Sequence, residues 1–365
     1  MIKIACIVGA RPNFMKSAPL LAELKKHPAV FAPYLIHTGQ HYDRRLFQLF
    51  FEDLKMPQPD FYLGVGSGSH ARQTATIMIR LEKVLKKLKP QLVIVFGDVN
   101  STVAAALVTS KLMIPLAHVE AGLRSFDMSM PEEVNRIVTD RLSDHLFVSE
   151  ASGLTNLKKE GIDSRRIHFT GNIMIDSLVN NLKVAKKSPI LKQLKLKPRK
   201  YIALTAHRPA NVDDKQTLTR MLEVFHQIGE RLPIIFPCHP RTRNNLEKHS
   251  LLSYFDNKAL RLLEPLGYLD FLKLQSEAFM VLTDSGGVQE ETTYLKISCL
   301  TMRDNTERPA TVRTGTNTIV GTDPDVIYRR AMAILGGRTK SGRIPKYWDG
   351  HTAERIVKVL LKLYG

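Results

Sequence analysis

The segment MVLTDSGGVQEET, residues 280–292, carries the clearest chemical signal in the chain. An apolar run leads into Asp284 and Ser285, two glycines follow, and the next residues are able to form a helix. This pattern predicts a buried strand that turns tightly into a helix N-terminus, where Gly286 and Gly287 let a ligand approach the backbone. The helix dipole and the first N–H groups attract an anion there, typically a phosphate. A plain strand-to-helix connection, capped by Asp284 or Ser285, is the alternative.

A basic segment follows the first apolar run of the chain. Arg11 and Lys16 lie in the turn and the predicted helix after that run, in the sequence GARPNFMK. This pair suits a diphosphate, because Arg binds two oxygens at once and Lys adds a mobile positive charge. A solvated helix face is the alternative for Lys16. The segment lacks the full GxGxxG spacing of a dinucleotide site, and the chain has no GxxxxGKS/T, HExxH or GxSxG, which argues against a P-loop kinase, a zinc hydrolase of that class and a serine hydrolase.

Carboxylates form the third group of candidate residues. Asp98 and Glu120 end two apolar runs that we expect to be neighbouring strands. Glu132 and Glu133 follow in the segment MSMPEEVNR, with Arg136 one helical turn after Glu132. Carboxylates near a cationic phosphate site are able to exchange protons and to stabilise a developing oxocarbenium ion. For one of the two adjacent glutamates we expect only a favourable place in the first turn of a helix, and for any single acidic strand end an N-cap is the alternative.

Histidines also lie near the ends of predicted strands. They are His41, His118, His207 and His239. A zinc site is the less favoured interpretation, because these residues are widely separated and the surrounding residues suit phosphate. We expect only His207, with Arg208 beside it, to belong to the site.

The elements that must position these residues follow a regular order. Short apolar runs alternate with longer helical patterns, and this βαβα rhythm predicts parallel, doubly wound α/β sheets that bind ligands at the carboxyl ends of their strands. The predicted strands are IKIACIV, APYLIHTG, QLVIVFG, IPLAHVE, DHLFVS and RIHFTG, and then KYIALTAH, PIIFPCH, LRLLEPL, FMVLTD and ISCLTMRD. The predicted helices are FMKSAPLLAELKKH, RRLFQLFFEDL, STVAAALVTSKL, 214–230 and 242–249.

The rhythm restarts after a basic, Pro-containing stretch at 183–200, which we interpret as a linker. We therefore predict two Rossmann-like domains that face each other across a cleft. The first spans 1–175 and carries the carboxylates, and the second spans 176–350 and binds the anionic ligand. The segment 351–365 has helical periodicity and is a candidate to pack back on the first domain.

The composition excludes several protein classes. The 365-residue chain has three separate cysteines, each in an apolar run, which indicates buried thiols in a reducing compartment. No stretch approaches the ~18 apolar residues of a membrane helix, and the N-terminal run leads into a polar turn, so we predict a cytoplasmic protein without a membrane partner. The formal charge of +18 suits an anionic substrate. Nucleic-acid binding is the alternative, but no basic segment is interleaved with aromatic residues, so we expect no nucleic-acid partner.

A series of motifs resembles the non-hydrolysing UDP-N-acetylglucosamine 2-epimerases in sequence and in order. They are GARPNFMKSAPL, HTGQHYD, VFGDVNST, AHVEAGLRS, MPEEVNR, GNIMIDSL, the HR of TAHRPANV, TDSGGVQEE and RDNTERP. The resemblance covers nearly the whole chain, and VEAGLRS, PEEVNR and TDSGGVQEE together are highly specific. It implies a glycosyltransferase B-like architecture, a homodimer, and interconversion of UDP-GlcNAc and UDP-ManNAc without a cofactor or a metal. UDP would leave to give 2-acetamidoglucal and would then add back.

The resemblance also implies roles for individual residues. Asp98, Glu120 and Glu132 would be the acid/base and oxocarbenium-stabilising carboxylates, and His207 would act at the diphosphate or the sugar. Glu291 would bind the ribose hydroxyls, and Phe271 would lie against uracil. The phosphates and the sugar would be held by Arg11, Lys16, Arg136, Ser285, Gly286, Gly287 and Arg308.

Three departures from the family pattern bear on the substrate and on regulation. Ala210 and Ala310 stand where many members carry Glu, which leaves a diacetamido-uronic acid UDP-sugar as a second candidate substrate. The segments QHYD and HPRT, at 40–43 and 239–242, differ from those of members that UDP-GlcNAc activates at a second site, so we expect weak or no activation. The motifs also leave open a hydrolysing epimerase and, less favoured, a retaining glycosyltransferase.

Overall fold

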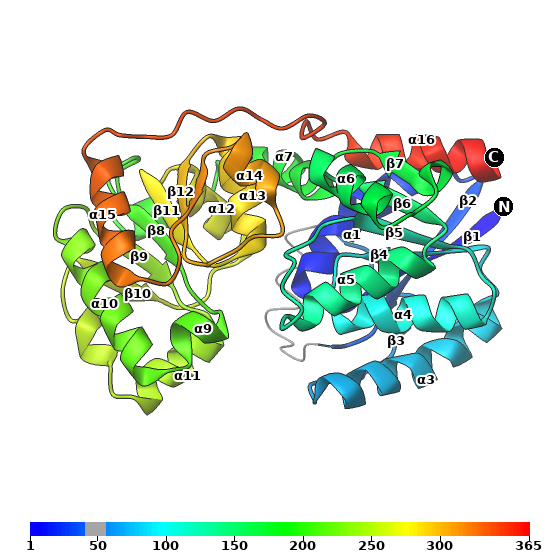
Figure 1. Cartoon of the computed structure of the whole chain (residues 1–365), viewed down its shortest axis with the longest axis horizontal. Helices are drawn as coiled ribbons and strands as arrows, with labels where there is room; N and C mark the ends of the chain where they lie inside the picture. The colour runs from blue at the N-terminus through cyan, green and yellow to red at the C-terminus, as the bar shows by residue number, and fades with distance from the viewer. Residues whose placement is uncertain (41–55) are drawn as a thin grey trace. The chain divides into compact units, whose positions relative to one another are not determined.

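The computed structural model describes residues 1–40 and 56–365, and the chain separates into two compact units. The first unit consists of Met1–Asn180 together with Lys346–Gly365, and the second unit is Asn181–Pro345. Each unit is built on a parallel β-sheet with helices packed against it (Figure 1). The predicted helix RRLFQLFFEDL and His41 lie outside the described residues.

The sheet of the first unit has, within the described residues, seven strands in the order β3-β2-β1-β4-β5-β6-β7. All of its neighbouring strands are parallel. The strand order reverses between β1 and β4, and ligands of open α/β sheets bind at the carboxyl ends of the strands beside such a reversal. The strands are β1 (Ile2–Val8), β2 (Phe31–His37), β3 (Phe61–Tyr62), β4 (Leu92–Phe96), β5 (Leu116–Ala121), β6 (His145–Val148) and β7 (Ile167–Phe169).

Helices cover both faces of this sheet (Figure 1). α3 (His70–Leu88), α4 (Asn100–Lys111) and α5 (Pro131–Leu142) pack side by side on one face, and α1 (Arg11–Leu24) packs with α16 (Thr352–Tyr364) on the other. Strand side chains alternate between the faces, and Ala5, Ile7, Val93 and Val95 share one core with Leu81 of α3. The remaining helices are α6 (Ala151–Lys159), the 3₁₀ helix η1 (Ser164–Arg166) and α7 (Ile173–Ala185), which continues across the division between the units.

The C-terminal segment, Lys346–Gly365, packs against the rest of the first unit and forms hydrogen bonds with it. The buried carboxylate of Asp176 accepts the backbone N–H groups of Thr352 at 3.1 Å and Ala353 at 2.7 Å, and so serves as the N-terminal cap of α16. The indole Nε1 of Trp348 donates to the carbonyl of Ser149 at 3.0 Å. The helix expected over 351–365 therefore packs against α1, which comes from the opposite end of the sequence (Figure 1).

The second unit repeats this plan. Its sheet has, in the described residues, six parallel strands in the order β10-β9-β8-β11-β12-β13, with the reversal between β8 and β11. The strands are β8 (Ile202–Thr205), β9 (Ile234–Pro237), β10 (Leu260–Leu263), β11 (Met280–Thr283), β12 (Ser298–Thr301) and β13 (Asn317–Ile319). The helices are α8 (Ile190–Gln193), α9 (Pro209–Val212), α10 (Lys215–Gly229), α11 (Pro240–Lys248), α12 (Tyr268–Ser276), α13 (Gly286–Leu295), α14 (Pro309–Arg313) and α15 (Pro324–Leu335), with η2 (Leu252–Phe255).

Two apolar cores, one on each face, stabilise the second sheet. Ile202 and Leu204 of β8 pack with residues of α10 and α15, whereas Tyr201 and Ala203 pack with residues of α12 and α13. Alternation along a strand buried on both faces explains why β8 appears in the sequence as a continuous apolar run. The N-cap of α10 is Asp214, which accepts the N–H of Thr217 at 2.8 Å.

The two predicted α/β domains with doubly wound parallel sheets are confirmed. The interpretation of 183–200 as a linker is wrong in part, because α7 extends to Ala185 and the next helix, α8, buries Ile190 and Leu191 in a core of the second unit. The sequence does not predict strands β3 and β13, which have two and three residues. In the described part of the chain, no helix is long and apolar enough to cross a membrane.

Candidate active site

The polar residues singled out in the sequence gather where the strand order of each sheet reverses. In the first unit, the turn after β1 leads into α1 with Lys16, and β4 leads into Gly97 and Asp98. In the second unit, β8 leads toward His207, and β11 leads into Asp284. The parallel arrangement brings the residues of each unit together, because the carboxyl ends of parallel strands lie at the same edge of a sheet.

A buried ion pair occupies this edge of the first sheet. The Nζ atom of Lys16 contacts the Oε2 atom of Glu120, and each side chain is only 4% exposed. The residues are 104 positions apart in the sequence. Breaking a buried pair on one side costs far more than breaking a surface pair, because the remaining charge is left without compensation. Lys16 is therefore not on a solvated helix face.

The backbone at Glu120 is strained. Its φ angle is +80°, a value that favours glycine, and the register between β5 and β6 shifts between Val119 and Ala121. A bulge of this kind redirects a side chain at the end of a strand, and non-glycine residues with such angles concentrate at functional sites. Because of this irregularity, the Glu120 side chain does not follow the strand's alternation between the two faces of the sheet, and its carboxylate lies beside Lys16.

Buried charged residues support the strand on both sides of Glu120. The Nδ1 atom of His118 lies 2.7 Å from Oδ1 of Asp140, and its Nε2 atom donates to the carbonyl of Gly97 at 2.8 Å. Asp140 also accepts the N–H of Gly122 at 3.0 Å and pairs with Arg124 at 2.7 Å. Burial raises the pKa of Asp140, but the charges and hydrogen bonds of His118 and Arg124 outweigh burial and hold the pKa below its usual value.

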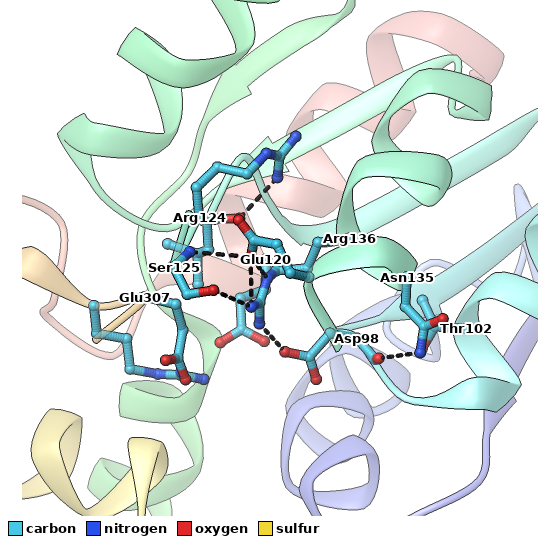
Figure 2. A network of polar contacts seen from close by, with 12 residues as sticks. Asp98, Thr102, Glu120, Arg124, Ser125, Asn135, Arg136 and Glu307 are labelled. Atoms are coloured by element: carbon cyan, nitrogen blue, oxygen red, sulfur yellow. Dashed lines mark hydrogen bonds and ion pairs between the residues drawn. The ribbon is translucent and has the colours of Figure 1, made fainter. Parts of the chain in front are cut away.

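Helix α5 carries the second group of site residues (Figure 2). Arg136 pairs with the Asp98 carboxylate through one nitrogen and with the Glu133 carboxylate, at 2.7 Å, through another. Asn135 donates to the backbone carbonyl of Asp98 at 2.8 Å. Asp98 is thus held at both its side chain and its backbone, while its side chain remains 24% exposed. It is accessible for chemistry and fixed in position.

The two adjacent glutamates of α5 have different surroundings. Glu133 is buried and accepts the N–H groups of Ser125 at 3.0 Å and Phe126 at 2.9 Å. Burial raises the pKa of Glu133, but these amides and Arg136 outweigh it and lower the pKa below its usual value. Glu132 is half-buried and accepts no hydrogen bond within the described residues. Glu133 is therefore the glutamate with a structural role, which leaves Glu132 as the candidate for chemistry.

In the second unit, Asp284 connects two strand ends and does not cap the helix that follows it. Its Oδ2 atom accepts the backbone N–H groups of His207 and Arg208, each at 2.8 Å, and Nδ2 of Asn211 at 3.1 Å. Its Oδ1 atom lies 3.0 Å from Nδ1 of His207. Burial raises the pKa of Asp284, but the hydrogen bond and charge of His207 and the two amides together lower it to about 2. The alternative in which Asp284 caps the following helix is wrong, because these donors occupy its carboxylate.

The N-terminus of α13 begins at Gly286, and its N-cap, Ser285, makes no side-chain capping bond. A Cβ atom at Gly286 would lie 2.6 Å from Nη1 of Arg308 and 2.9 Å from Oε1 of Glu307, so a larger residue would displace these two side chains. Arg308 is buried between two carboxylates; its Nε atom lies 2.9 Å from Glu290, and it also contacts Glu307. The predicted phosphate cradle thus has a cation packed against its first glycine.

Two further residues predicted to bind the ligand, Glu291 and Phe271, are buried in the second unit. Glu291 accepts a hydrogen bond from the hydroxyl of Tyr268 at 3.1 Å and one from the amide of Gln275, and it is 4% exposed. Phe271 is 8% exposed and belongs to the core formed by α12, α13 and the sheet. The contact between Phe271 and uracil remains a prediction. Such a contact would involve only the small exposed part of the Phe271 ring.

The predicted histidines do not share one role. His118 bonds to Asp140 and to Gly97 as described, and Nδ1 of His239 accepts the N–H of Arg241 at 3.2 Å as the N-cap of α11. His207 is the one paired with Asp284. Among residues 1–40 and 56–365, no three His, Cys, Asp or Glu side chains are grouped so that they could hold a metal ion. Arg11 begins α1, but its side chain lies outside the described part of the structure.

Sequence reasoning does not identify Asp140, Arg124 and Asn135. The sequence contains a signal for Asp140, because it lies four residues after Arg136 and so one helical turn further along. In the structure both residues are buried on α5. His118, two residues before Glu120 in AHVEAG, is recognisable in the sequence only as a possible metal ligand. The identity of its partner requires the packing of α5 against β5, which periodicity does not reveal.

Gly97 provides a test of the Lys16–Glu120 pair. It has φ +61°, and a Cβ atom there would lie 2.7 Å from Lys16 Nζ and 3.2 Å from Glu120 Oε2. We expect Gly97→Ala to lower turnover by about 10²-fold, because displacing a reacting group by about 1 Å costs that much. Steady-state turnover and thermal melting would measure the effect.

The matched control is Gly161→Ala, at φ +73° with no atom within 4 Å of the added Cβ. It imposes a similar backbone strain without touching the ion pair, so the melting temperature should fall less than in Gly97→Ala while turnover is kept. Equal turnover in both variants would show that the position of the pair is unimportant.

Comparison with known proteins extends over both units. A model of the family described as UDP-N-acetylglucosamine 2-epimerase matches residues 22–361. A Methanococcus maripaludis protein named UDP-N-acetylglucosamine 2-epimerase homolog is 45% identical over 368 residues, which cover 99% of this chain and all of that one. The crystal structure of Methanocaldococcus jannaschii UDP-GlcNAc 2-epimerase in complex with UDP-GlcNAc and UDP is 42% identical, with a TM-score of 0.92 over 99% of this chain and 100% of that chain. A Pseudomonas aeruginosa UDP-2,3-diacetamido-2,3-dideoxy-D-glucuronate 2-epimerase is 39% identical over 99% of this chain and 100% of its own.

Proposed function

The chain belongs to the UDP-N-acetylglucosamine 2-epimerase family and is an isomerase, and from this premise we propose that it interconverts UDP-GlcNAc and UDP-ManNAc. The observation that carries the proposal is the set of paired carboxylates and cations at the strand reversal of the first sheet, Lys16 with Glu120 and Arg136 with Asp98. It occurs in a chain 42% identical to an epimerase whose crystal structure contains UDP-GlcNAc and UDP.

The proposed reaction proceeds by elimination and re-addition. The bond between C1 and the diphosphate oxygen breaks and its electron pair leaves with UDP, while the proton at C2 passes to a base and C1=C2 forms. The intermediate is 2-acetamidoglucal. A proton then returns to C2 on the opposite face, and the diphosphate oxygen bonds again to C1, so that atoms and electrons balance. The C2 proton is only weakly acidic, so departure of UDP leads and cations that stabilise the leaving diphosphate assist it.

The first unit supplies the acid/base groups in this proposal. Asp98, Glu120 and Glu132 take and return the C2 proton and stabilise the oxocarbenium character that develops at C1. Lys16 and Arg136 hold two of these carboxylates in place by the ion pairs described above and contribute positive charge toward the diphosphate. Arg11, at the start of α1, is proposed to add a further cation.

The second unit supplies the groups that hold UDP. The N–H groups at the start of α13 and the hydroxyl of Ser285 bind phosphate oxygens, Gly286 and Gly287 permit the approach, and Arg308 adds its charge. Glu291 binds the ribose hydroxyls, since the bonds from Tyr268 and Gln275 fix its carboxylate. His207 acts at the diphosphate or the sugar.

Three competing functions receive less support. Three relatives named for UDP-GlcNAc are 41–45% identical to the chain, and the relative named for the diacetamido-uronic acid is 39% identical, so the latter substrate is not favoured. A retaining glycosyltransferase would need an acceptor, and it would release UDP only when that acceptor is present. A hydrolysing epimerase would give ManNAc and UDP as final products.

The proposal is tested by incubating the protein with UDP-GlcNAc in heavy water and following the sugar by NMR. We expect UDP-ManNAc to appear and deuterium to enter C2 of both UDP-sugars, because the proton taken from C2 exchanges with solvent before one returns. Unlabelled UDP-ManNAc would exclude this exchange mechanism. ManNAc as the sole product would reject the proposal in favour of a hydrolysing epimerase, and the absence of product without an acceptor would favour a glycosyltransferase.

A further inference from the structure

His207 and Asp284 lie on neighbouring strand ends of the second sheet. Strand β8 pairs with β11 in parallel, with Thr205 opposite Thr283, so the residues that follow each strand meet at one edge. The His207 ring is 38% exposed, whereas the Asp284 side chain is completely buried. The pair therefore has one partner fixed inside the unit and one partner that reaches the surface of the unit.

The hydrogen bonds around Asp284 determine which of its oxygens faces the ring. Oδ2 accepts three donors, the N–H groups of His207 and Arg208 and the Nδ2 of Asn211. Oδ1 is buried, makes no hydrogen bond of good geometry in the described structure, and lies 3.0 Å from Nδ1 of His207, the ring nitrogen placed to donate to it. A carboxylate oxygen only accepts, so the proton of this contact belongs to Nδ1 of His207. Nε2 is then the nitrogen that the ring presents outward.

We infer that Asp284 is a positioning residue that fixes His207 in the Nδ1-protonated form and directs its Nε2 atom at the leaving diphosphate of the substrate. The inference rests on the proposed function, because it assigns the atom through which His207 acts in that reaction. As the C1–O bond breaks, negative charge develops on the diphosphate, and an Nε2–H group of the imidazolium donates a hydrogen bond to it. The buried carboxylate stabilises that imidazolium, as in the Asp–His pairs of hydrolytic triads.

The neighbouring histidine does not have this arrangement. The ring of His239 lies near that of His207, with centroids 5.3 Å apart, but its Nδ1 atom accepts the N–H of Arg241 as a helix cap. An accepting Nδ1 carries no proton, so His239 in its neutral form is the Nε2-protonated tautomer. The two adjacent rings are thus expected to have opposite tautomers, a difference that a measurement on the unmodified protein detects.

The first test is long-range ¹H–¹⁵N NMR of the full chain labelled at histidine, without substrate. His207→Gln assigns the signal by its loss. Above the pH at which the ring becomes neutral, we expect the wild-type His207 to show a protonated Nδ1 and an unprotonated Nε2. A neutral His207 with the proton on Nε2 would overturn the inference. This measurement requires no activity, so its outcome is independent of whether the proposed reaction is correct.

The second test is Asp284→Asn, for which the structure predicts a reversed tautomer. The three donors at Oδ2 require the oxygen of the new amide there, which turns its NH₂ group toward His207 Nδ1. Nδ1 must then accept, and the proton moves to Nε2. We expect kcat to fall by about 10²-fold with KM changed less than about threefold, because the neutral amide no longer stabilises the His207 imidazolium that donates to the leaving diphosphate. An unchanged tautomer in a folded Asp284→Asn protein would overturn the inference.

The third test separates positioning from a general loss of structure. If Asp284 acts through His207, Asp284→Asn should lower kcat little further in a His207→Gln background, so the two effects should not add. A full additional loss of about 10²-fold in the double variant would show that Asp284 acts by another route. The control is Asp256→Asn, in the same unit and away from the pair, which should keep the wild-type kcat and the wild-type tautomer of His207.

Discussion

Asp98→Asn, Glu120→Gln and Glu132→Gln are each expected to lower turnover by about two to four orders of magnitude, the usual contribution of a positioned acid or base. Each change keeps the size of the side chain and removes its ability to take a proton. Binding of UDP should be largely kept, because most residues proposed to hold UDP lie in the second unit, and the first-unit cations Arg11, Lys16 and Arg136 are unchanged in these variants. Turnover by NMR and UDP binding by calorimetry would measure the two effects separately.

The three variants should not be equivalent in stability. Glu120→Gln should lower the melting temperature, because it leaves the buried Lys16 with a neutral partner. Glu132→Gln should leave the melting temperature unchanged, because Glu132 accepts no hydrogen bond in the described structure. Glu82→Gln is a suitable control in the same unit, since the Glu82 side chain is 46% exposed and pairs with Lys86 one helical turn away. It should retain wild-type turnover. Near-native rates in all three site variants would show that the chemistry lies elsewhere.

Asp140→Ala is expected to destabilise the first unit by about 3–5 kcal/mol, the cost of removing one partner from a buried charged network. The change removes one of the two carboxylates that pair with Arg124, which keeps Glu160, and it removes the acceptor of the Gly122 N–H and the carboxylate that fixes the His118 ring. Urea unfolding followed by tryptophan fluorescence measures this loss directly. Trp348 is the single tryptophan of the chain and lies buried in the first unit, so its emission reports on that unit.

The loss in Asp140→Ala should depend on pH with a definite sign. The pKa of Asp140 is lower in the folded state than in the unfolded chain, so the carboxylate stabilises the fold fully above about pH 4 and progressively less as the pH falls through the folded value. The free energy of unfolding of the wild type should therefore approach that of Asp140→Ala in acid. The exposed Asp163, which pairs with Arg165 at the surface, provides the control, and Asp163→Ala should unfold close to the wild type at neutral pH. A neutral-pH midpoint for Asp140→Ala equal to that of the control would contradict a stabilising role.

The proposed catalytic residues and their supports are joined through helix α5. Arg136 on this helix holds Asp98, and Asp140, one turn further along, accepts the N–H of Gly122, two residues after Glu120. Since Glu132 lies on α5 itself, one helix connects all three proposed acid/base groups. Such support matters because a misplacement of about 1 Å lowers rates by about 10²-fold.

The sequence alone determined the architecture and most of the candidate residues. Continuous apolar runs followed by helical periodicity specify a parallel α/β sheet, and in such a sheet every strand delivers its next residue to the same edge. Asp98, His207 and Asp284 could be assigned to such an edge for that reason. The turn with Gly286 was recognisable as a helix N-terminus because glycine pairs between a strand and a helix have few other uses.

Only the tertiary structure decided which residues are partners and which glutamate is buried. Lys16 and Glu120 are 104 residues apart, and a strained backbone angle at Glu120 brings them together. Adjacent positions of α5 separate into a buried Glu133 and a half-buried Glu132, because helix orientation against the sheet decides which side chain meets backbone donors. Local periodicity encodes which elements form, whereas burial and hydrogen-bond partners depend on the distances between elements far apart in the chain, and those distances are set only when the layers pack.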